Sequence, residues 1–374
     1  LPPAPGLATR RAWLATGALV LLPLWVPVFW GAVLAMMAVP MRRQMMQRVP
    51  WLQAQPGTAS ALTVLMVLLG GIDVDARACR DFYTLNGVTQ ACVDLFSLEQ
   101  YRAWHGHMPP EGWREATAGT VRAAAQWQFP DIVFLSAPCK GFSGLLPALH
   151  ASTLKYQALN ELTLRGVWLM LEAFGDDLPG LIVFENVPRI ATRGRHLLDQ
   201  IVSMLQHYGY ATAETTHDCG ELGDGLGQSR RRFLLVARLV RKVPPFLYEP
   251  PKRGLRSVGD VLQHVPLPGD AVGGPMHRIP ALQWKTWVRL AFVEAGTGPA
   301  SRGERFVLDG ESDQRWREAI GNAVPRKSAK AIGTVMGQTI LLARNGETFV
   351  LGSTPIWVRP MVAALAVARE GGVA

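Results

Sequence analysis

The segment Asp131–Leu146, with the sequence DIVFLSAPCKGFSGLL, decides the fold that we predict for this chain. Its apolar run Ile132–Leu135 is too short to form a helical apolar face and predicts a buried strand. Ser136 follows the strand, and Cys139 comes three residues later. Because the ligand crevice of an open α/β sheet lies beyond the carboxyl ends of its strands, we expect Cys139 at the rim of that crevice. The neighbouring Lys140 favours the thiolate, which is the nucleophilic form of cysteine.

A second segment has the same construction. Leu181–Phe184 (LIVF) is another short apolar run, and Glu185 and Asn186 follow it directly. A lone cysteine after a strand is more often a buried structural thiol, and a lone glutamate there is more often a loop carboxylate. Two buried strands that each end in a chemically capable residue favour a different interpretation. A thiolate would attack an electron-poor ring, and an acid would handle a proton.

Four motifs, in this order, resemble those of the DNA cytosine-5 methyltransferases. They are Pro138–Ser143 (PCKGFS), Glu185–Val187 (ENV), Gln228–Arg232 (QSRRR) and Gly321–Pro325 (GNAVP). One such motif is a weak signal, whereas four in the family's order are specific. The resemblance covers about residues 71–342. It implies a Rossmann-like α/β fold that binds S-adenosyl-L-methionine, with a small, reduced target-recognition lobe.

The resemblance also implies a reaction, the transfer of a methyl group to carbon 5 of cytosine in DNA. Carbon 5 is a poor nucleophile until carbon 6 is attacked, so Cys139 would add to carbon 6 and form a covalent adduct. Glu185 would bond or protonate ring nitrogen 3. Pro138 and Asn186 would hold these two groups in place.

The same resemblance implies a cofactor site. Leu62–Asp75 predicts a buried strand that ends in acids, and Asp73 takes the position that binds a ribose hydroxyl, with Asp75 as the nearby alternative. Cys92–Asp94 resembles the short third strand, whose acid lies near the adenine amino group. The residues that the resemblance assigns to the cofactor are Asp73, Asp94, Pro138 and Asn322.

The sequence departs from the family in one respect. The family opens with a strand and an aromatic-x-Gly-x-Gly loop that holds the methionine end of the cofactor, and nothing before Asp73 matches it. We therefore expect the chain as it stands to bind S-adenosyl-L-methionine weakly or not at all. Two alternatives stay open, a cytosine-5 methyltransferase that acts on transfer RNA and a catalytically impaired nucleic-acid-binding relative.

The charge of the chain suits a polyanionic partner. Its 374 residues carry a formal net charge of +9. Gln228–Arg256 holds nine basic residues against Glu249 alone, a density that favours phosphate contact over a merely solvated basic face. By resemblance, Arg230 and Arg232 would help to hold a nucleotide that is flipped out of the stack. The implied partners are double-stranded DNA and a cognate restriction endonuclease, with the chain as a monomer in the cytoplasm.

The cysteine spacing predicts neither a metal site nor structural disulfides. The four cysteines show no CxxC spacing, and His217–Glu221 fits none of the zinc templates. Ala12–Pro40 has no charged residue and is long enough to cross a bilayer, although Pro23 and Pro27 interrupt it. We expect a truncated or remodelled N-terminus there, with a membrane anchor as the alternative.

Periodicity along the chain predicts alternating strands and helices, the pattern of a doubly wound sheet. A strand is expected at Phe233–Ala237, and helices at Ala76–Leu85, Lys155–Phe174, His196–Tyr208 and Lys327–Ala343. The predicted segments are 1–60 (an apolar N-terminal segment), 61–243 (catalytic), 244–317 (reduced target-recognition region), 318–345 (return to the catalytic domain) and 346–374 (tail).

Overall fold

The computed structural model describes residues 34–38, 67–136, 153–222, 228–244, 247–248, 250, 252–256, 266, 269–274, 283–284, 326–344 and 356–358. Three predicted site residues, Pro138, Cys139 and Asn322, lie outside these described residues.

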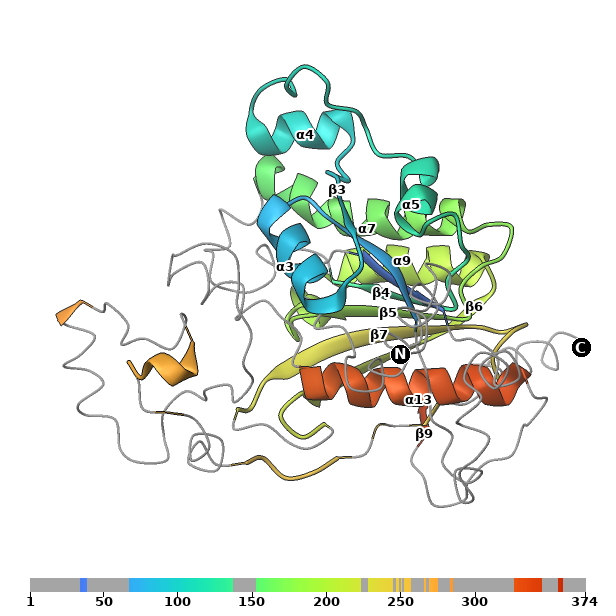
Figure 1. Cartoon of the computed structure of the whole chain (residues 1–374). Coiled ribbons are helices and arrows are strands. Elements are labelled where there is room, and N and C mark those ends of the chain that lie inside the picture. Colours follow the sequence, from blue (N-terminus) through green and yellow to red (C-terminus); the bar gives the residue numbers. More distant parts are fainter. Residues whose placement is uncertain are drawn as a thin grey trace, which may run out of the picture.

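Within the described residues, seven strands form one mixed sheet in the order β3-β2-β1-β4-β5-β7-β6 (Figure 1). The strands are β1 (Leu34–Ala38), β2 (Val67–Asp73), β3 (Gln90–Cys92), β4 (Ile132–Leu135), β5 (Leu181–Asn186), β6 (Tyr210–Asp218) and β7 (Arg231–Leu239). β2 is parallel to β3, and β4 is parallel to β5. β7 is antiparallel to both β5 and β6. As a result β2 to β6 all end on the same side of the sheet, which we call its carboxyl end, and β7 begins there.

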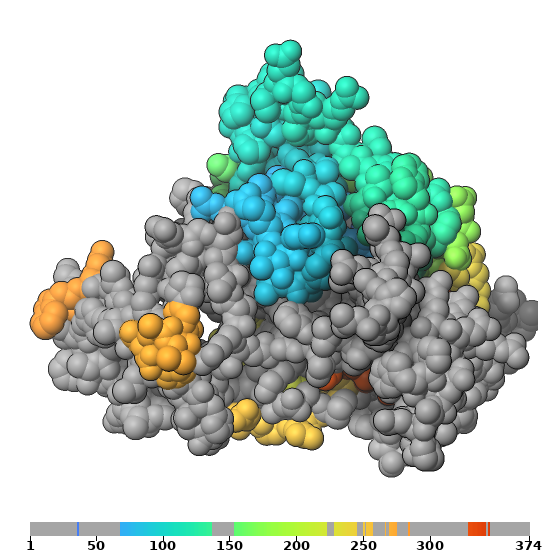
Figure 2. Space-filling view, viewed as in Figure 1, coloured from blue at the N-terminus to red at the C-terminus, as the bar shows by residue number. Residues whose placement is uncertain are grey.

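Helices cover both faces of this sheet. They are α3 (Ala76–Asn86), α4 (Leu98–His105), α5 (Ala118–Ala124), α7 (Leu154–Ala173), α8 (Ile190–Arg193), α9 (Arg195–His207) and α13 (Arg326–Arg344). Figure 1 shows α4, α5, α7 and α9 above the sheet and α13 below it. The space-filling view (Figure 2) shows α3 at the surface, with the segment that contains α4 projecting above it.

The alternation of side chains along β4 explains why its sequence is apolar throughout. Val133 and Leu135 pack with residues of α7 and α9 on one face of the sheet. Ile132 and Phe134 pack with α13 and with Phe82 of α3 on the other face. Because successive strand residues point to opposite faces, a strand covered on both sides needs an unbroken apolar run. The same argument applies to Leu181–Phe184 in β5, where every residue is buried.

The predicted Rossmann-like α/β fold is confirmed, and its elements follow the predicted order. The strands predicted at Ile132–Leu135, Leu181–Phe184 and Phe233–Ala237 are β4, part of β5 and part of β7, and the four predicted helices are α3, α7, α9 and α13. Local signals set several boundaries. The Asp75 side chain accepts from the backbone N–H of Arg77 and begins α3, and Gly87 ends it with φ 68°.

β1 is a strand that the sequence analysis did not predict. It comes from the apolar N-terminal segment and lies between β2 and β4, antiparallel to both. Its first residue, Leu34, pairs with Ile72 on one side and Leu135 on the other. Met36 is completely buried, as expected for a strand with helices on both faces. Because β1 runs against its neighbours, its beginning and not its end lies at the carboxyl end of the sheet.

Two short strands outside the main sheet connect distant parts of the sequence. β8 (Leu247–Tyr248) belongs to the predicted target-recognition region, and β9 (Ile356–Val358) belongs to the predicted tail. They pair antiparallel, with Leu247 opposite Val358. Over the ranges that the structure describes, no helix is both long enough and apolar enough to cross a membrane. Apart from β1, the run Ala12–Pro40 lies outside those ranges.

Candidate active site

Glu185 lies at the carboxyl end of β5 and is 6 % exposed. Its two carboxyl oxygens have different partners. Arg232 Nε lies 2.7 Å from Oε1, and the Ser136 hydroxyl donates to Oε2 over 2.8 Å. Strand register accounts for the serine contact, because Leu135 of β4 pairs with Phe184 of β5 and the next residues continue side by side.

Burial raises the pKa of the Glu185 carboxyl above its ordinary value. Arg232, the hydroxyl of Ser136 and Arg230 act in the opposite direction, because each stabilises the ionised form. The rise that remains means that Glu185 keeps a proton to higher pH than an exposed glutamate. A buried acid of this kind can hold a proton and deliver it to a bound group.

The turn before β7 is ordered by Asp218, the last residue of β6. Its Oδ1 accepts from the backbone N–H of Gly220 at 2.8 Å and of Arg230 at 2.7 Å, and its other oxygen accepts from the Ser229 hydroxyl. Burial acts to raise the pKa of Asp218, but these hydrogen bonds outweigh it and lower the pKa. A Cβ at Gly220 would lie 2.1 Å from the carbonyl oxygen of Gln228, so the turn requires glycine there.

This turn sets the direction of the arginines that follow. Arg230 is 8 % exposed and Arg232 bonds Glu185, whereas Arg231 between them is exposed. Side chains alternate along an extended chain, so the first and third arginines lie on one side and the second on the other. The two arginines that the resemblance selected are therefore the two that act on Glu185.

Asn186 follows Glu185 and is 2 % exposed. Its Oδ1 accepts from the backbone N–H of Val187 at 2.8 Å. Within the part of the chain that the structure describes, its Nδ2 has no hydrogen-bond partner. A buried amide donor without a partner is unfavourable by about 1–3 kcal/mol. Asn186 thus has a buried side-chain donor that no described group uses.

Asp73 is the last residue of β2 and is 5 % exposed. Burial raises the pKa of its carboxyl to about 7, and repulsion from Asp75 adds to the rise. The backbone N–H of Asp75 donates to Asp73 Oδ1 at 2.7 Å and partly offsets this effect. Asp75 itself is exposed and caps α3. The two acids therefore have separate roles, and Asp73 is the one that is buried at the strand end.

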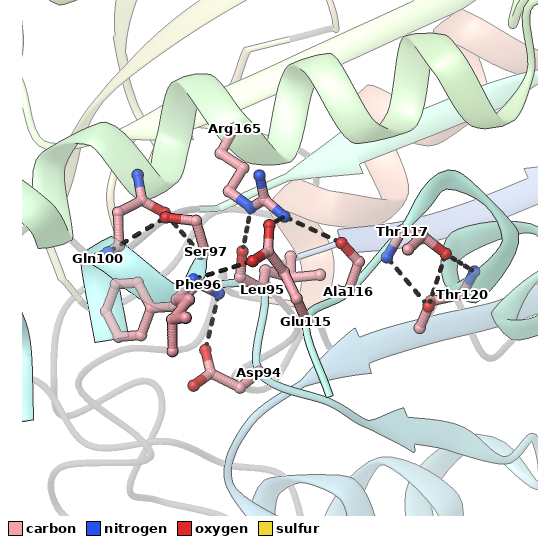
Figure 3. A network of polar contacts seen from close by, with 11 residues as sticks. Asp94, Leu95, Phe96, Ser97, Gln100, Glu115, Ala116, Thr117, Thr120 and Arg165 are labelled. Atoms are coloured by element: carbon pink, nitrogen blue, oxygen red, sulfur yellow. Dashed lines mark hydrogen bonds and ion pairs between the residues drawn. The ribbon is translucent and has the colours of Figure 1, made fainter. Parts of the chain in front are cut away.

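Asp94 follows β3 and belongs to the turn that leads into α4 (Figure 3). Its Oδ1 accepts from the backbone N–H of Phe96 at 2.9 Å. The next residue, Ser97, forms a capping box with Gln100 at the start of α4. Because Asp73 pairs with Cys92, the ends of β2 and β3 lie side by side, and Asp94 follows two residues after that pair.

Arg165 of α7 fixes this turn from the other side (Figure 3). Its Nε donates to the carbonyl of Leu95 at 2.8 Å, and its Nη2 bonds Glu115 at 2.7 Å. The other oxygen of Glu115 accepts from the backbone N–H of Leu98 at 3.0 Å. The guanidinium and this carboxylate thus hold both ends of the segment between β3 and α4. No sequence motif identified either residue.

The described residues fit one end of S-adenosyl-L-methionine. Asp73 and Asp94 offer carboxylates at the ends of two neighbouring strands, as a ribose and an adenine amino group require. For the methionine end, the described residues offer no corresponding group. Between β2 and β4 the chain enters β1 at Leu34, and no glycine-rich loop leaves a parallel strand there among the described residues.

The structure brings Glu185, Asn186, Arg230 and Arg232 together at the ends of β5 and β7. α13 starts at Arg326, four residues after Asn322, and the Ser328 hydroxyl in its first turn donates to the carbonyl of Cys219 at 2.6 Å. That carbonyl lies directly after β6, so α13 begins at the carboxyl end of the sheet. Ser136 and Asp218, which contact Glu185 and the turn before β7, were not predicted from the sequence as site residues. In the sequence, only their position near a motif could have indicated a role at the site.

Comparison with known proteins agrees with this geometry. The sheet and its helices form a Rossmann-like α/β fold. Residues 93–267 match the family model described as C-5 cytosine-specific DNA methylase. The resemblance to this family is therefore confirmed over a stretch that reaches from the end of β3 to beyond β8. Asp73 and Gly321–Pro325 lie outside the match.

Several solved structures are similar to the chain at low identity. A prophage-encoded E. coli protein, assigned as a DNA modification methyltransferase, is 16% identical over 52% of this chain and 47% of its own, with a TM-score of 0.38. The methyltransferase EhMeth of Entamoeba histolytica is 13% identical over 74% and 86%, with a TM-score of 0.35. The Dnmt2 methyltransferase of S. pombe is 15% identical over 75% and 90%, with a TM-score of 0.29. The chain spans about half the length of the prophage protein. No curated protein matches the sequence.

Proposed function

We propose that this chain transfers a methyl group to carbon 5 of cytosine in DNA, through a covalent adduct at Cys139. The observation that carries the proposal is the environment of Glu185. This buried acid has a raised pKa and lies beside Ser136, the first residue of the segment that leads to Cys139. Attack on a pyrimidine ring requires two groups, a nucleophile and an acid close to it. Cys139 and Glu185 would be these two groups. The match to the C-5 cytosine-specific DNA methylases supports the same chemistry.

In this mechanism the thiolate of Cys139 adds to carbon 6 of the ring. Electron density then moves toward ring nitrogen 3, where Glu185 bonds or protonates the ring and stabilises the resulting enamine. S-adenosyl-L-methionine, when bound, supplies the methyl group to carbon 5. Glu185 can act there because Arg232 and Ser136 fix both of its oxygens. The amide of Asn186, buried and with an available donor, would hold the loop of Pro138 and Cys139.

The target base must leave the stack before the thiolate can reach carbon 6, at a cost of a few kcal/mol. Arg230 and Arg232 both act on Glu185 and would help to hold the extruded nucleotide. Arg232 is ion-paired to Glu185, so its contact with the nucleotide would be shared with the carboxylate. The positive charge of the chain favours a polyanionic substrate.

The cofactor is part of the proposal. Asp73 and Asp94 would hold the ribose and the adenine, and Arg165 would keep the Asp94 turn in place. The segment after Asn322 begins α13 at the same end of the sheet, which agrees with a role for Asn322 beside the cofactor.

A mechanism-based trap tests the reaction. Provided that the cofactor site is complete, duplex DNA with 5-fluorocytosine at the target, incubated with the purified chain and S-adenosyl-L-methionine, should form an adduct that survives denaturation. The fluorine cannot leave carbon 5 as a proton does, so the adduct accumulates. Mass spectrometry should locate it on Cys139, and Cys139→Ser should abolish it, because a serine hydroxyl is essentially un-ionised near neutral pH.

The same assay decides the alternatives. Cys219 is buried and its pKa is raised to about 12, so Cys219→Ser should leave trapping intact. An adduct on another cysteine, or methylation by Cys139→Ser, would overturn the assignment of the nucleophile. Trapping by transfer RNA with 5-fluorocytosine but not by duplex DNA would assign an RNA substrate. Binding of duplex DNA without any adduct would identify a catalytically impaired relative.

A further inference from the structure

The two hydrogen-bond donors on Glu185 are chemically different. The guanidinium of Arg232 donates to Oε1 through Nε, 2.7 Å away. A guanidinium can only donate, because it is not deprotonated in proteins. The hydroxyl of Ser136, 2.8 Å from Oε2, carries one hydrogen and two lone pairs. It can donate to a carboxylate and can also accept from a carboxylic acid.

This difference selects the oxygen that can carry the proton. If Oε1 were protonated, its hydrogen would compete with the N–H of Arg232 for the same side of the carboxyl. Oε2 meets no such conflict, because the hydroxyl of Ser136 can rotate and accept. Protonation adds one hydrogen to Oε2, while the serine keeps its own hydrogen and turns it away. No proton is gained or lost by the serine itself.

We propose that Ser136 is a positioning residue for Glu185, donating to Oε2 while the group is ionised and accepting from Oε2 once it is protonated. The inference rests on the proposed function for its catalytic meaning, but the contact itself does not. Ser136 would thereby keep the acid in one orientation through both of its states. A carboxyl group whose two oxygens are held by a cation and by a reversible hydroxyl keeps the same orientation in both protonation states.

The other groups around Glu185 do not offer this property. Arg230 and Arg232 of the β7 side are permanent cations. Cys219, after β6, interacts electrostatically with Glu185, but burial raises its pKa to about 12 and it stays a neutral thiol. Ser136, after β4, is therefore the one reversible partner among the described groups that act on Glu185.

The test measures the protonation of the Glu185 carboxyl directly. The full chain labelled with carbon-13 at the glutamate carboxyls is titrated by NMR, with Glu185→Gln identifying the signal. Ser136→Ala should raise the pKa of Glu185 by about one unit, because the hydrogen bond to the ionised carboxylate is stronger than the one accepted from the protonated acid. Ser136→Thr should restore the parent value. Thr339→Val is a matched control that removes a buried hydroxyl from α13, and it should leave the titration unchanged.

Trapping rates against pH provide the second readout. In Ser136→Ala the high-pH limb of the profile, where Glu185 loses its proton, should move upward by the same amount as the NMR titration, whereas loss of folding alone would lower the rate at every pH. An unchanged Glu185 titration in Ser136→Ala, or an equal shift in Thr339→Val, would overturn the proposal. Absence of trapping by the parent chain would overturn the proposed function, and the NMR titration would still decide the role of Ser136.

Discussion

An arginine lies at each end of the sheet, partly buried at the carboxyl end and fully buried at the opposite, amino end, and the two have different partners. At the carboxyl end Arg232 bonds the buried carboxyl of Glu185 at 2.7 Å. At the amino end Arg238 is 1 % exposed, and its one described hydrogen bond goes from Nη1 to the carbonyl of Val243 at 3.1 Å. Its Nε and Nη2 have no partner in the described part of the chain. One arginine serves a carboxyl that can exchange a proton, and the other serves only the backbone.

Ion pairs at the amino end join secondary-structure elements to each other. Arg344, the last residue of α13, pairs with Asp131 at the start of β4. Lys242, after β7, pairs with Asp177 before β5 at 2.5 Å. Their side chains are more exposed than that of Glu185, and such pairs contribute about 0–1 kcal/mol. The ion pairs at the amino end thus join secondary-structure elements to each other, whereas at the carboxyl end Arg230 and Arg232 both act on Glu185.

This difference changes the interpretation of the basic segment Gln228–Arg256. β7 runs from the carboxyl end of the sheet to its amino end. Arg238, Arg241 and Lys242 therefore lie at the amino end, away from the candidate site. Lys252 bridges to Leu222 and returns the chain to the carboxyl end. The basic residues of Gln228–Arg256 are therefore divided between the two ends of the sheet. The prediction of a phosphate-binding surface must be restricted to the basic residues at the carboxyl end.

The largest effect should come from the acid itself. Glu185→Gln removes the proton that the mechanism needs and should slow trapping about 100-fold or more. Asp131→Asn is the matched change at the amino end, where the carboxylate serves α13, and it should trap at the parent rate. Rates of adduct formation measured on denaturing gels give both values. Equal losses in the two variants would show that Glu185 acts only through stability.

The two arginines give the next contrast. Arg232→Met removes the group that holds Oε1 of Glu185 and should slow trapping by about tenfold to 100-fold, because the acid is no longer fixed in its orientation. Arg238→Met should trap normally. Its free energy of unfolding in urea should stay the same or rise by about 1–2 kcal/mol, because the guanidinium is buried and the described residues supply no counterion. A loss of trapping in Arg238→Met alone would reverse the comparison.

Salt dependence separates the two groups of basic residues. Replacing Lys252, Arg253 and Arg256 by Gln should reduce the slope of log affinity for duplex DNA against log salt by about two to three units, given about 0.9 per phosphate contact. Affinity near 0.1 M salt should fall about tenfold. Replacing Arg241 and Lys242 should leave the slope unchanged. Fluorescence anisotropy over a salt series measures both, and identical slopes would contradict the division of the segment.

The smallest effect concerns pH and stability at Asp73. Burial raises its pKa from 3.8 to about 7, so between these values the folded chain binds a proton that the unfolded chain has released. Stability should therefore fall as pH rises from about 4 to about 7. Asp73→Asn removes this loss and should be more stable than the parent at pH 8 by a few kcal/mol at most, with no gain at pH 4. Urea unfolding at the two pH values checks it, and a gain of equal size at both would exclude the titration of Asp73 as the cause.

Much of the fold was predictable because its signals are local. An unbroken apolar run such as Leu181–Phe184 can be buried on both faces only inside a covered sheet, and helical spacing with a cap such as Asp75 sets a helix start. The acids at strand ends could be predicted for the same reason, since parallel strands end together. Residues such as Ser136 and Arg165 could not, because a serine after a strand or an arginine on a helix has no distinctive sequence pattern.

The sequence by itself determined the strands, the helices and the residue types at the carboxyl end of the sheet. Only the tertiary structure decided that Leu34–Ala38 enters the sheet against its neighbours, that Ser136 meets Oε2 of Glu185, and that β7 carries Arg238 away from Arg232. Apolar periodicity fixes which residues are buried, but a strand of given composition pairs in either direction. Direction and register depend on contacts between segments far apart in the chain, and those contacts place each charge beside its partner.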